Sequence, residues 1–409
     1  MSVIRGRISG QPMDMNRYLS KVVQSIPPSG IRKFFDLVAQ NEGVISLGVG
    51  EPDFATPWHV TEQACYSLEQ GETMYTSNQG LPELREEIAL YQKRHIGVEY
   101  SPANQILVTI GVSEAVDLAI RALVEPGDEV LVPEPSYVSY SPEATLAYAN
   151  PVPVPTYDAD QYRLRPDVLE KCISPRSKIL VLPYPCNPTG GIMDREDLQA
   201  LVDLIIKNDL IVLSDEIYSE LTYYGQHVSI ASLPGMRDRT IVMNGFSKSF
   251  AMTGWRVGYA CGHPDLIAAM NKIHQYTIMC APIMGQKAAI EALRHGEEEM
   301  HRMVDSYNYR RKIILSGLTS IGLECFEPRG AFYCFPSIAI SGMNSEEFCE
   351  KLLLEENVAV VPGNAFGSNG DGFIRCCYAA SIANIEQAIE RMGRFLNRHT
   401  YEESLNLEA

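Results

Sequence analysis

Short apolar runs alternate with amphipathic helical patterns along most of this 409-residue chain. After Asp194, apolar residues recur at positions 198, 201, 202 and 205, a helical spacing that Asp194 is suited to cap. Strands covered by helices on both faces carry continuous apolar runs. The pattern therefore predicts a mostly parallel sheet between two layers of helices. The runs that we interpret as its strands are residues 106–109, 129–132, 178–182, 210–213, 240–243 and 257–260.

The patterning changes towards the end of the chain. Helical patterns dominate from about residue 285 to residue 311, and short strand-like runs return between residues 330 and 377. We therefore expect an α/β protein with two domains, which the chain length permits. A large domain would hold the mostly parallel sheet, and a smaller α+β domain would be built from both chain ends. The predicted ranges are residues 47–284 for the large domain and residues 1–46 with 285–409 for the small one.

Composition narrows the range of partners. The chain has 34 basic and 51 acidic side chains and a net charge of −17, which repels nucleic acid and anionic membranes. No apolar run approaches the ~18 residues of a membrane span, and the first residues lack the apolar core of a signal peptide. We expect a cytoplasmic protein. The ten cysteines form no C-x-x-C and the eight histidines lack metal-ligand spacing, so we expect reduced thiols and no metal.

Polar residues follow several of the predicted strands. In open α/β sheets, ligands bind outside the carboxyl ends of the strands. Polar residues that arrive at this one edge from separate strands are therefore candidates for a common site. They are Ser113, Asn187, Asp215 and Lys248.

The segment around Lys248 combines groups that suit one kind of ligand. A lysine amine forms a Schiff base with a carbonyl, while the Ser247 hydroxyl and the Arg256 guanidinium suit a phosphate. The backbone amides of Val112 and Ser113, at a predicted helix N-terminus, would add phosphate donors, although Ser113 is equally suited to be a plain helix cap. Together these groups describe a pocket for pyridoxal 5′-phosphate. Taken alone, Lys248 would be interpreted as a solvated surface residue.

Two further charged residues lie in apolar surroundings. Asp215 ends a predicted buried strand, where a carboxylate is costly unless it is paired with a cation. A protonated pyridine nitrogen is such a partner, and the pairing would keep the ring an electron sink; a helix-capping role is the alternative. Arg375 lies within an apolar, strand-like run and needs an anion, and its fork fits a carboxylate.

The segment 244–259 resembles the lysine signature of the class I/II aminotransferases. The likeness runs from about residue 25 to residue 390, and within the family it is greatest to bacterial aminotransferase A, the N-acetyl-diaminopimelate aminotransferase, through residues 29–34, 214–223 and 274–276. The resemblance implies fold type I of the transferases that depend on pyridoxal 5′-phosphate. It also implies pyridoxal 5′-phosphate as the cofactor.

The resemblance also implies roles in holding the cofactor. Lys248 would hold it covalently and then act as the base, and Asp215 would pair with the ring nitrogen. Asn187 and Tyr218 would hydrogen-bond the phenolic oxygen of the cofactor. Tyr137 would stack on the ring, although a loop tyrosine beside a strand is more commonly a core aromatic.

Other matched residues concern the substrate and a second subunit. Tyr75 matches a tyrosine that reaches the phosphate from the neighbouring subunit, so the resemblance implies a homodimer. Arg375 would hold the α-carboxylate of the substrate, and the backbone of Gly48 would close over it. Arg32, in a helix predicted over residues 31–38 and capped by Ser29, is a candidate partner for a distal carboxylate or simply an exposed arginine.

The implied activity is transfer of an amino group between an L-amino acid and a 2-oxo acid. We expect glutamate and 2-oxoglutarate as one pair and consider N-acetyl-diaminopimelate as a donor. An aspartate or aromatic aminotransferase is an alternative, and so is a carbon–sulfur β-lyase, which would share every cofactor residue. A regulator with a DNA-binding module is not expected, because only about 25 residues precede the first family-like segment.

Overall fold

The computed structural model describes residues 14–28, 30 and 43–407. The predicted helix over residues 31–38, its cap Ser29 and the candidate Arg32 lie outside this part of the chain. No helix within the described part is long and apolar enough to cross a membrane.

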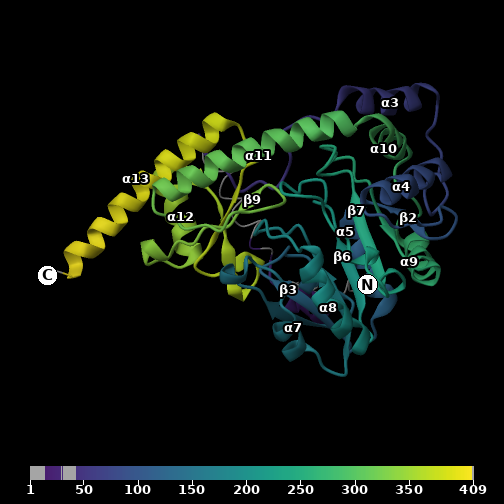
Figure 1. The fold of residues 1–409 in the computed structure, drawn as a ribbon, viewed down its shortest axis with the longest axis horizontal. Coiled ribbons are helices and arrows are strands. Elements are labelled where there is room, and N and C mark those ends of the chain that lie inside the picture. The colour runs from purple at the N-terminus through teal and green to yellow at the C-terminus, as the bar shows by residue number, and fades with distance from the viewer. Residues whose placement is uncertain (1–13, 29, 31–42, 408–409) are drawn as a thin grey trace, which may run out of the picture.

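A seven-stranded sheet forms the centre of the protein (Figure 1). All of its strand pairs are parallel except those of β8, which runs antiparallel to both neighbours. Each of the six apolar runs interpreted as strands of this sheet overlaps one of its strands, so the expectation of a mostly parallel sheet is confirmed. In spatial order, the strands are β2 (Ile106–Thr109), β8 (Gly258–Cys261), β7 (Thr240–Gly245), β6 (Ile211–Asp215), β5 (Ser177–Leu182), β3 (Glu129–Glu134) and β4 (Asn150–Pro155).

Strand β4 was not predicted from the sequence. It carries prolines at positions 151, 153 and 155, and proline has no backbone N–H to donate to a neighbouring strand. In the sheet, β4 pairs with β3 at the end of the strand order. Only one side of such a strand needs ladder hydrogen bonds, so an edge position tolerates proline.

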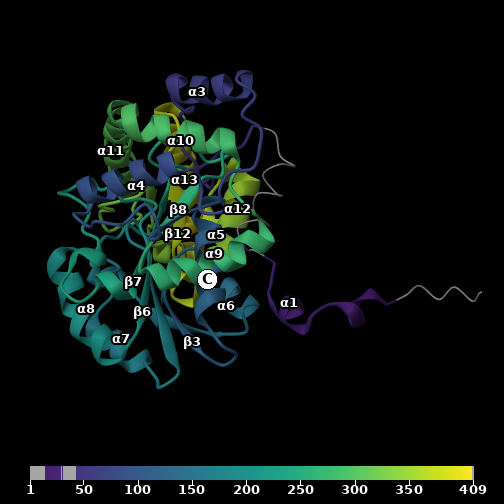
Figure 2. The ribbon, with the colours of Figure 1, turned by 90° about the vertical axis from the view of Figure 1, so that its right-hand side faces the viewer.

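Helices cover both faces of the sheet (Figures 1 and 2). On one face, α5, α6 and α9 share an apolar core with the strands. On the other face, α7 and α8 pack over β5 and β6, while α3, α4 and α10 pack over β2 and β8. These helices are α3 (Trp58–Glu69), α4 (Pro82–His95), α5 (Gly111–Leu123), α6 (Tyr140–Leu146), α7 (Pro166–Cys172), α8 (Arg195–Lys207), α9 (Pro264–Thr277) and α10 (Ile283–His295).

The helix predicted after Asp194 is α8. Asp194 is its N-cap residue, and the backbone N–H of Asp194 donates to the Asp197 carboxylate at 2.9 Å. The apolar stripe from Leu198 to Ile205 is buried against the sheet. Here local spacing and capping chemistry alone predict the element and its start.

A second group of elements joins both ends of the chain. Strand β1 pairs in parallel with β10, and β11, β12 and β9 form an antiparallel sheet. The helical stretch expected from residue 285 is two helices, α10 and α11, which meet at Gly296. The elements are β1 (Ile45–Ser46), α11 (Glu297–Ser320), β9 (Tyr333–Cys334), α12 (Ser345–Glu356), β10 (Val358–Ala359), β11 (Val361–Pro362), β12 (Ile374–Cys377) and α13 (Ile382–Leu407).

The short strands between residues 330 and 377 are interrupted by α12, which Asn344 caps by accepting from the Glu347 N–H at 2.9 Å. The division of the chain at residue 284 stays a prediction. Helix α10 contacts α3 and α4, elements of the range predicted for the large domain.

Short helices complete the described part of the chain. Helix α1 (Lys21–Ser25) lies beside α6 (Figure 2). The 3₁₀ helices are η1 (Met15–Tyr18), η2 (Asp158–Asp160), η3 (Ile230–Ser232), η4 (Arg237–Arg239), η5 (Ala339–Ser341), η6 (Gly363–Phe366) and η7 (Ser368–Gly370).

Candidate active site

A cavity of about 940 Å³ lies at the carboxyl ends of β5, β6 and β7. Parallel strands end at a common edge, so residues that follow different strands reach the same space. Most of the predicted site residues line this cavity. They are Val112, Ser113, Tyr137, Asn187, Asp215, Tyr218, Ser247, Lys248, Arg256 and Arg375.

Lys248 follows β7 and points its amine at the N-terminal segment of the chain. Its Nζ donates a hydrogen bond to the carbonyl oxygen of Gly50 at 2.7 Å. Desolvation lowers the pKa of the amine to about 8, although Cys377 and Glu51 act in the opposite direction. The lowered pKa favours the neutral amine over the charged one, and a nucleophile or a base requires the neutral form.

Asp215 is the last residue of β6 and is buried. Its Oδ2 accepts a hydrogen bond from the Tyr140 hydroxyl at 2.7 Å, and its Oδ1 accepts from the Ile217 N–H at 3.2 Å. Burial nevertheless raises the pKa of this carboxyl to about 6. The charged form is therefore costly here, and a ligand cation beside Asp215 would offset that cost.

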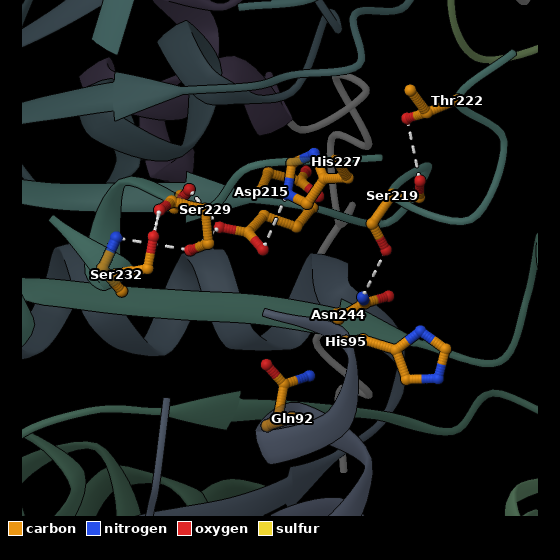
Figure 3. Close-up of polar contacts among 12 residues, drawn as sticks. Gln92, His95, Asp215, Ser219, Thr222, His227, Ser229, Ser232 and Asn244 are labelled. Atoms are coloured by element: carbon orange, nitrogen blue, oxygen red, sulfur yellow. Dashed lines mark hydrogen bonds and ion pairs between the residues drawn. The ribbon is translucent and has the colours of Figure 1, made fainter. Parts of the chain in front are cut away.

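A buried polar network supports the segment that carries Asp215 (Figure 3). The next residue, Glu216, accepts hydrogen bonds from the Ser214 and Ser229 hydroxyls at 2.7 and 2.5 Å. The Nε2 of His227 lies 3.0 Å from the second carboxylate oxygen of Glu216. The side chains of the residues before and after Asp215 are therefore hydrogen-bonded, which helps to hold the backbone of Asp215 in place.

Another part of the cavity wall is built around the start of α5. A Cβ at Gly111, whose φ is +70°, would lie 2.4 Å from Nη2 of Arg256, and a Cβ at Gly258 would lie 2.8 Å from the backbone nitrogen of Val112. Glycine at position 111 lets the guanidinium approach the helix N-terminus, and glycine at position 258 lets β8 pack against the first residues of α5. The backbone amides of Val112 and Ser113 in the first turn of α5, the helix dipole and the Arg256 cation are together suited to an anion.

Arg375 comes from β12 and is only 3% exposed. It donates from Nη1 to Oδ1 of Asn187 at 2.9 Å and from Nη2 to the Gly48 carbonyl at 2.6 Å. Its guanidinium also lies over the rings of Tyr333 and Phe366, 4.6 and 4.9 Å from their centroids. Its buried Nε has no hydrogen-bond partner among the described residues. A fixed, incompletely paired cation suits a substrate carboxylate.

Of the predicted site residues that the structure describes, Tyr75 and Gly48 are not among those that line the cavity. Tyr75 is 80% exposed on the surface of the chain, and Arg32 lies outside the described residues. It stays a prediction that Tyr75 reaches the phosphate bound in a neighbouring subunit. The contact of Arg32 with a distal carboxylate also stays a prediction. Gly48 reaches the site through its carbonyl contact with Arg375.

The sequence analysis missed several residues of the cavity. Tyr140 bonds Asp215, Tyr333 bonds the hydroxyl of Tyr218 at 2.8 Å, and Glu143 lines the wall with a pKa raised by burial to about 8. Tyr140 and Glu143 lie close after Tyr137, so helical spacing from that residue was an available signal. Tyr333 stands in an apolar run and offers no chemical signal in the sequence.

The groups around the cavity fit pyridoxal 5′-phosphate. Lys248 provides an amine of lowered pKa for its aldehyde, and the start of α5 with Arg256 forms a cradle for its phosphate. Asp215 provides a buried carboxylate that a cation would stabilise, and a protonated ring nitrogen is such a cation.

The comparisons with known proteins agree with this fit. The sequence profile of the family described as "Aminotransferase class I and II" matches residues 42–392. The chain is 52% identical to the putative aminotransferase YugH of Bacillus subtilis, over 94% of this chain and 100% of that one. It is 44% identical to an aspartate aminotransferase of Pyrococcus abyssi (92% and 98% covered) and 42% identical to a probable N-acetyl-LL-diaminopimelate aminotransferase of B. subtilis (93% and 96%).

Solved structures show the same similarity. A Pyrococcus protein named protein-A1 superposes with a TM-score of 0.91 at 43% identity, over 92% of this chain and 98% of that one. The aromatic aminotransferase of Pyrococcus horikoshii superposes with a TM-score of 0.86 at 43% identity, over 89% and 99%. The predicted type I fold is thereby confirmed. The chain belongs to the class I and II aminotransferases, and pyridoxal 5′-phosphate is its cofactor.

Proposed function

We propose that this aminotransferase uses the cavity beside Lys248 to exchange an amino group between an L-amino acid and a 2-oxo acid, with glutamate and 2-oxoglutarate as one substrate pair. The observation that carries the assignment of the site is the Lys248 amine, whose pKa burial lowers to about 8. This amine lines the same cavity as the buried carboxyl of Asp215 and the fixed guanidinium of Arg375.

Pyridoxal 5′-phosphate supplies, when bound, the carbonyl carbon that takes up the amino group and the ring that withdraws electrons. Asp215 stabilises the protonated ring nitrogen by charge pairing. The Asn187 carbonyl oxygen already accepts from Arg375, which leaves its amide nitrogen to donate to the phenolic oxygen. Tyr218 donates to the same oxygen through its hydroxyl. Ser247, Arg256 and the start of α5 bind the phosphate, and Tyr137 packs against the ring.

Lys248 serves as the base for the transfer of hydrogen. Its neutral amine would remove the proton from Cα of the amino acid and hold that proton on Nζ. A base works best when its pKa lies near the operating pH, and burial lowers the pKa of Lys248 towards that range. The Gly50 carbonyl, 2.7 Å away, orients the amine.

Arg375 binds the group that all substrates share. Every amino acid and every 2-oxo acid in the exchange carries a carboxylate next to the reacting carbon, and one guanidinium can hold both in turn. The contacts with Asn187 and Gly48 fix the guanidinium before the substrate arrives. One site then serves both half-reactions, and the kinetics are ping-pong.

We propose N-acetyl-diaminopimelate as the amino donor, with aspartate or an aromatic amino acid as the competing assignment. The relatives and the structure named aspartate, aromatic and N-acetyl-LL-diaminopimelate aminotransferase are all 42–44% identical to this chain, so identity does not choose among them. Among the described residues, the cations lining the cavity are Lys248, Arg256 and Arg375, which already have proposed roles. A distal carboxylate would then be bound by Arg32.

We also propose a homodimer in which Tyr75 reaches the phosphate of the neighbouring subunit. Met74, Tyr75 and Tyr276 are 75%, 80% and 84% exposed, which is high for large apolar side chains. The segment of Tyr75 and the end of α9 are joined by a hydrogen bond from Asn78 to the Met279 carbonyl at 2.7 Å. These exposed side chains support an interface there.

A screen of amino donors tests the proposed substrates. The purified protein, loaded with cofactor, would be mixed with single amino acids, and conversion of the cofactor to its aminated form would be followed by absorbance. We expect fast conversion by glutamate and N-acetyl-diaminopimelate. Faster conversion by aspartate or phenylalanine than by N-acetyl-diaminopimelate would transfer the assignment to the competing donor class. No conversion by glutamate would overturn the proposed pair.

A further inference from the structure

Tyr333 links two residues of the cavity wall, Tyr218 and Arg375. Its hydroxyl lies 2.8 Å from the hydroxyl of Tyr218, and its ring lies under the guanidinium of Arg375, 4.6 Å from centroid to Cζ. The side chain is 1% exposed and lines the cavity. It therefore contacts both the proposed hydrogen-bond donor for the cofactor and the proposed anchor for the substrate.

The hydroxyl pair has one sensible direction. Tyr218 uses its proton for the phenolic oxygen of the cofactor in the proposed function, on which this inference rests. The Tyr218 oxygen is then left to accept, and Tyr333 must be the donor. A hydroxyl that accepts a hydrogen bond becomes a stronger donor itself, because hydrogen bonds in a chain polarise one another.

The chain leaves room for the Tyr333 hydroxyl at one glycine. A Cβ at Gly50 would lie 2.5 Å from the Tyr333 oxygen but 3.4 Å from the ring carbon that carries it. The Gly50 carbonyl meanwhile accepts from Lys248 at 2.7 Å and lies 3.5 Å from the Tyr333 hydroxyl. Glycine at position 50 is thus needed for the hydroxyl rather than for the ring.

We propose that Tyr333 is a positioning residue of the aminotransferase site, which strengthens the Tyr218 hydrogen bond to the cofactor through its hydroxyl and holds the substrate-binding Arg375 through its ring. The two functions are carried by different parts of one side chain. They can therefore be separated by substitution.

Tyr333→Phe removes the hydroxyl and keeps the ring. The readout is the pH midpoint of the absorbance change of the bound cofactor, which reports how well the phenolic oxygen is stabilised as an anion. A weaker donor at Tyr218 disfavours the anion, so the pH midpoint rises. We expect a rise of about 0.3 to 0.5 pH units, because one hydrogen bond strengthens its neighbour by only a modest fraction. The KM values for glutamate and 2-oxoglutarate stay within twofold.

Tyr333→Leu removes the ring as well. Loss of the stacking contact with Arg375 raises both KM values about five- to tenfold, in addition to the midpoint shift. Tyr307→Phe is the matched control. Its hydroxyl lies buried in the same apolar cluster and has no hydrogen-bond partner among the described residues, so neither the midpoint nor KM changes.

Double variants decide whether Tyr333 acts through Tyr218. Tyr218→Phe raises the midpoint, and adding Tyr333→Phe to it raises the midpoint no further. Gly50→Ala, which displaces the Tyr333 hydroxyl, raises the midpoint as Tyr333→Phe does, and the two together show no added shift.

The outcomes separate this inference from the proposed function. A midpoint in Tyr333→Phe within 0.1 unit of the parent protein, or a further shift on the Tyr218→Phe background, overturns the role of Tyr333 while Tyr218 keeps its own. No shift in Tyr218→Phe itself overturns the proposed contact of Tyr218 with the cofactor, and the role of Tyr333 fails with it.

Discussion

The buried carboxyl of Asp215 should lower the free energy of unfolding of the cofactor-free protein when the carboxyl is ionised. Burial raises the pKa of its carboxyl from 3.8 to about 6, so the folded state holds this proton more tightly than the unfolded state does. Stability is therefore lost as the pH rises from about 4 to 6, and the loss is complete above pH 6. A shift of about two units corresponds to on the order of 3 kcal/mol.

Replacement of Asp215 by Asn removes this cost and keeps the shape of the side chain. The Ile217 N–H can still donate to the amide oxygen, and the Tyr140 hydroxyl can accept from the amide nitrogen. We expect the cofactor-free variant to be more stable than the parent by about 2 to 3 kcal/mol at pH 8 and by about half as much at pH 5. The same variant should have lost most of its aminotransferase activity.

Urea unfolding of the cofactor-free proteins at pH 5 and pH 8 measures the difference. Asp128→Asn is a control of opposite sign, because the Glu125 N–H and Lys178 lower the pKa of Asp128, and its loss should destabilise the protein at pH 8. Adding cofactor should stabilise the parent more than Asp215→Asn. A variant no more stable than the parent at pH 8, or a gain independent of pH, would refute the reasoning.

Three shorter predictions concern other parts of the site. Lys248→Ala should abolish transamination in a steady-state assay while the fold, followed by circular dichroism, is kept; retained turnover would contradict the assignment. In the cofactor-free protein, trinitrobenzenesulfonate should label Lys248 with a midpoint near pH 8, because burial lowers the amine pKa, and a midpoint near the ordinary lysine value would contradict this. Arg375→Ala should raise KM for glutamate and 2-oxoglutarate about a hundredfold, with a smaller loss in kcat, since a charge-assisted double hydrogen bond is lost; an unchanged KM for either would be inconsistent with a shared anchor.

The sequence by itself determined the layers of the fold and the main chemistry of the site. Continuous apolar runs marked the strands, because side chains buried on both faces must all be apolar. The polar residues Asn187, Asp215 and Lys248 stood just after those runs, and the topology of a parallel sheet brings such positions to one edge. Local order along the chain was enough for these predictions.

Strand β4 marks the limit of that local information. Its prolines are unfavourable in a central strand, and only its place at the end of the strand order makes them acceptable. Position in a sheet depends on which strands pair, and pairing joins segments that are distant in sequence. A local pattern therefore could not identify this strand.

Tertiary structure alone decided how the site residues are held. The Tyr140–Asp215 and Tyr218–Tyr333 hydrogen bonds join residues 75 and 115 positions apart, and the contact between Arg375 and Asn187 spans 188. Tyrosine is as common in a core as in a site, so its residue type indicates neither role. Partner choice and burial, which set the pKa values of Asp215 and Lys248, arise only when distant segments pack together.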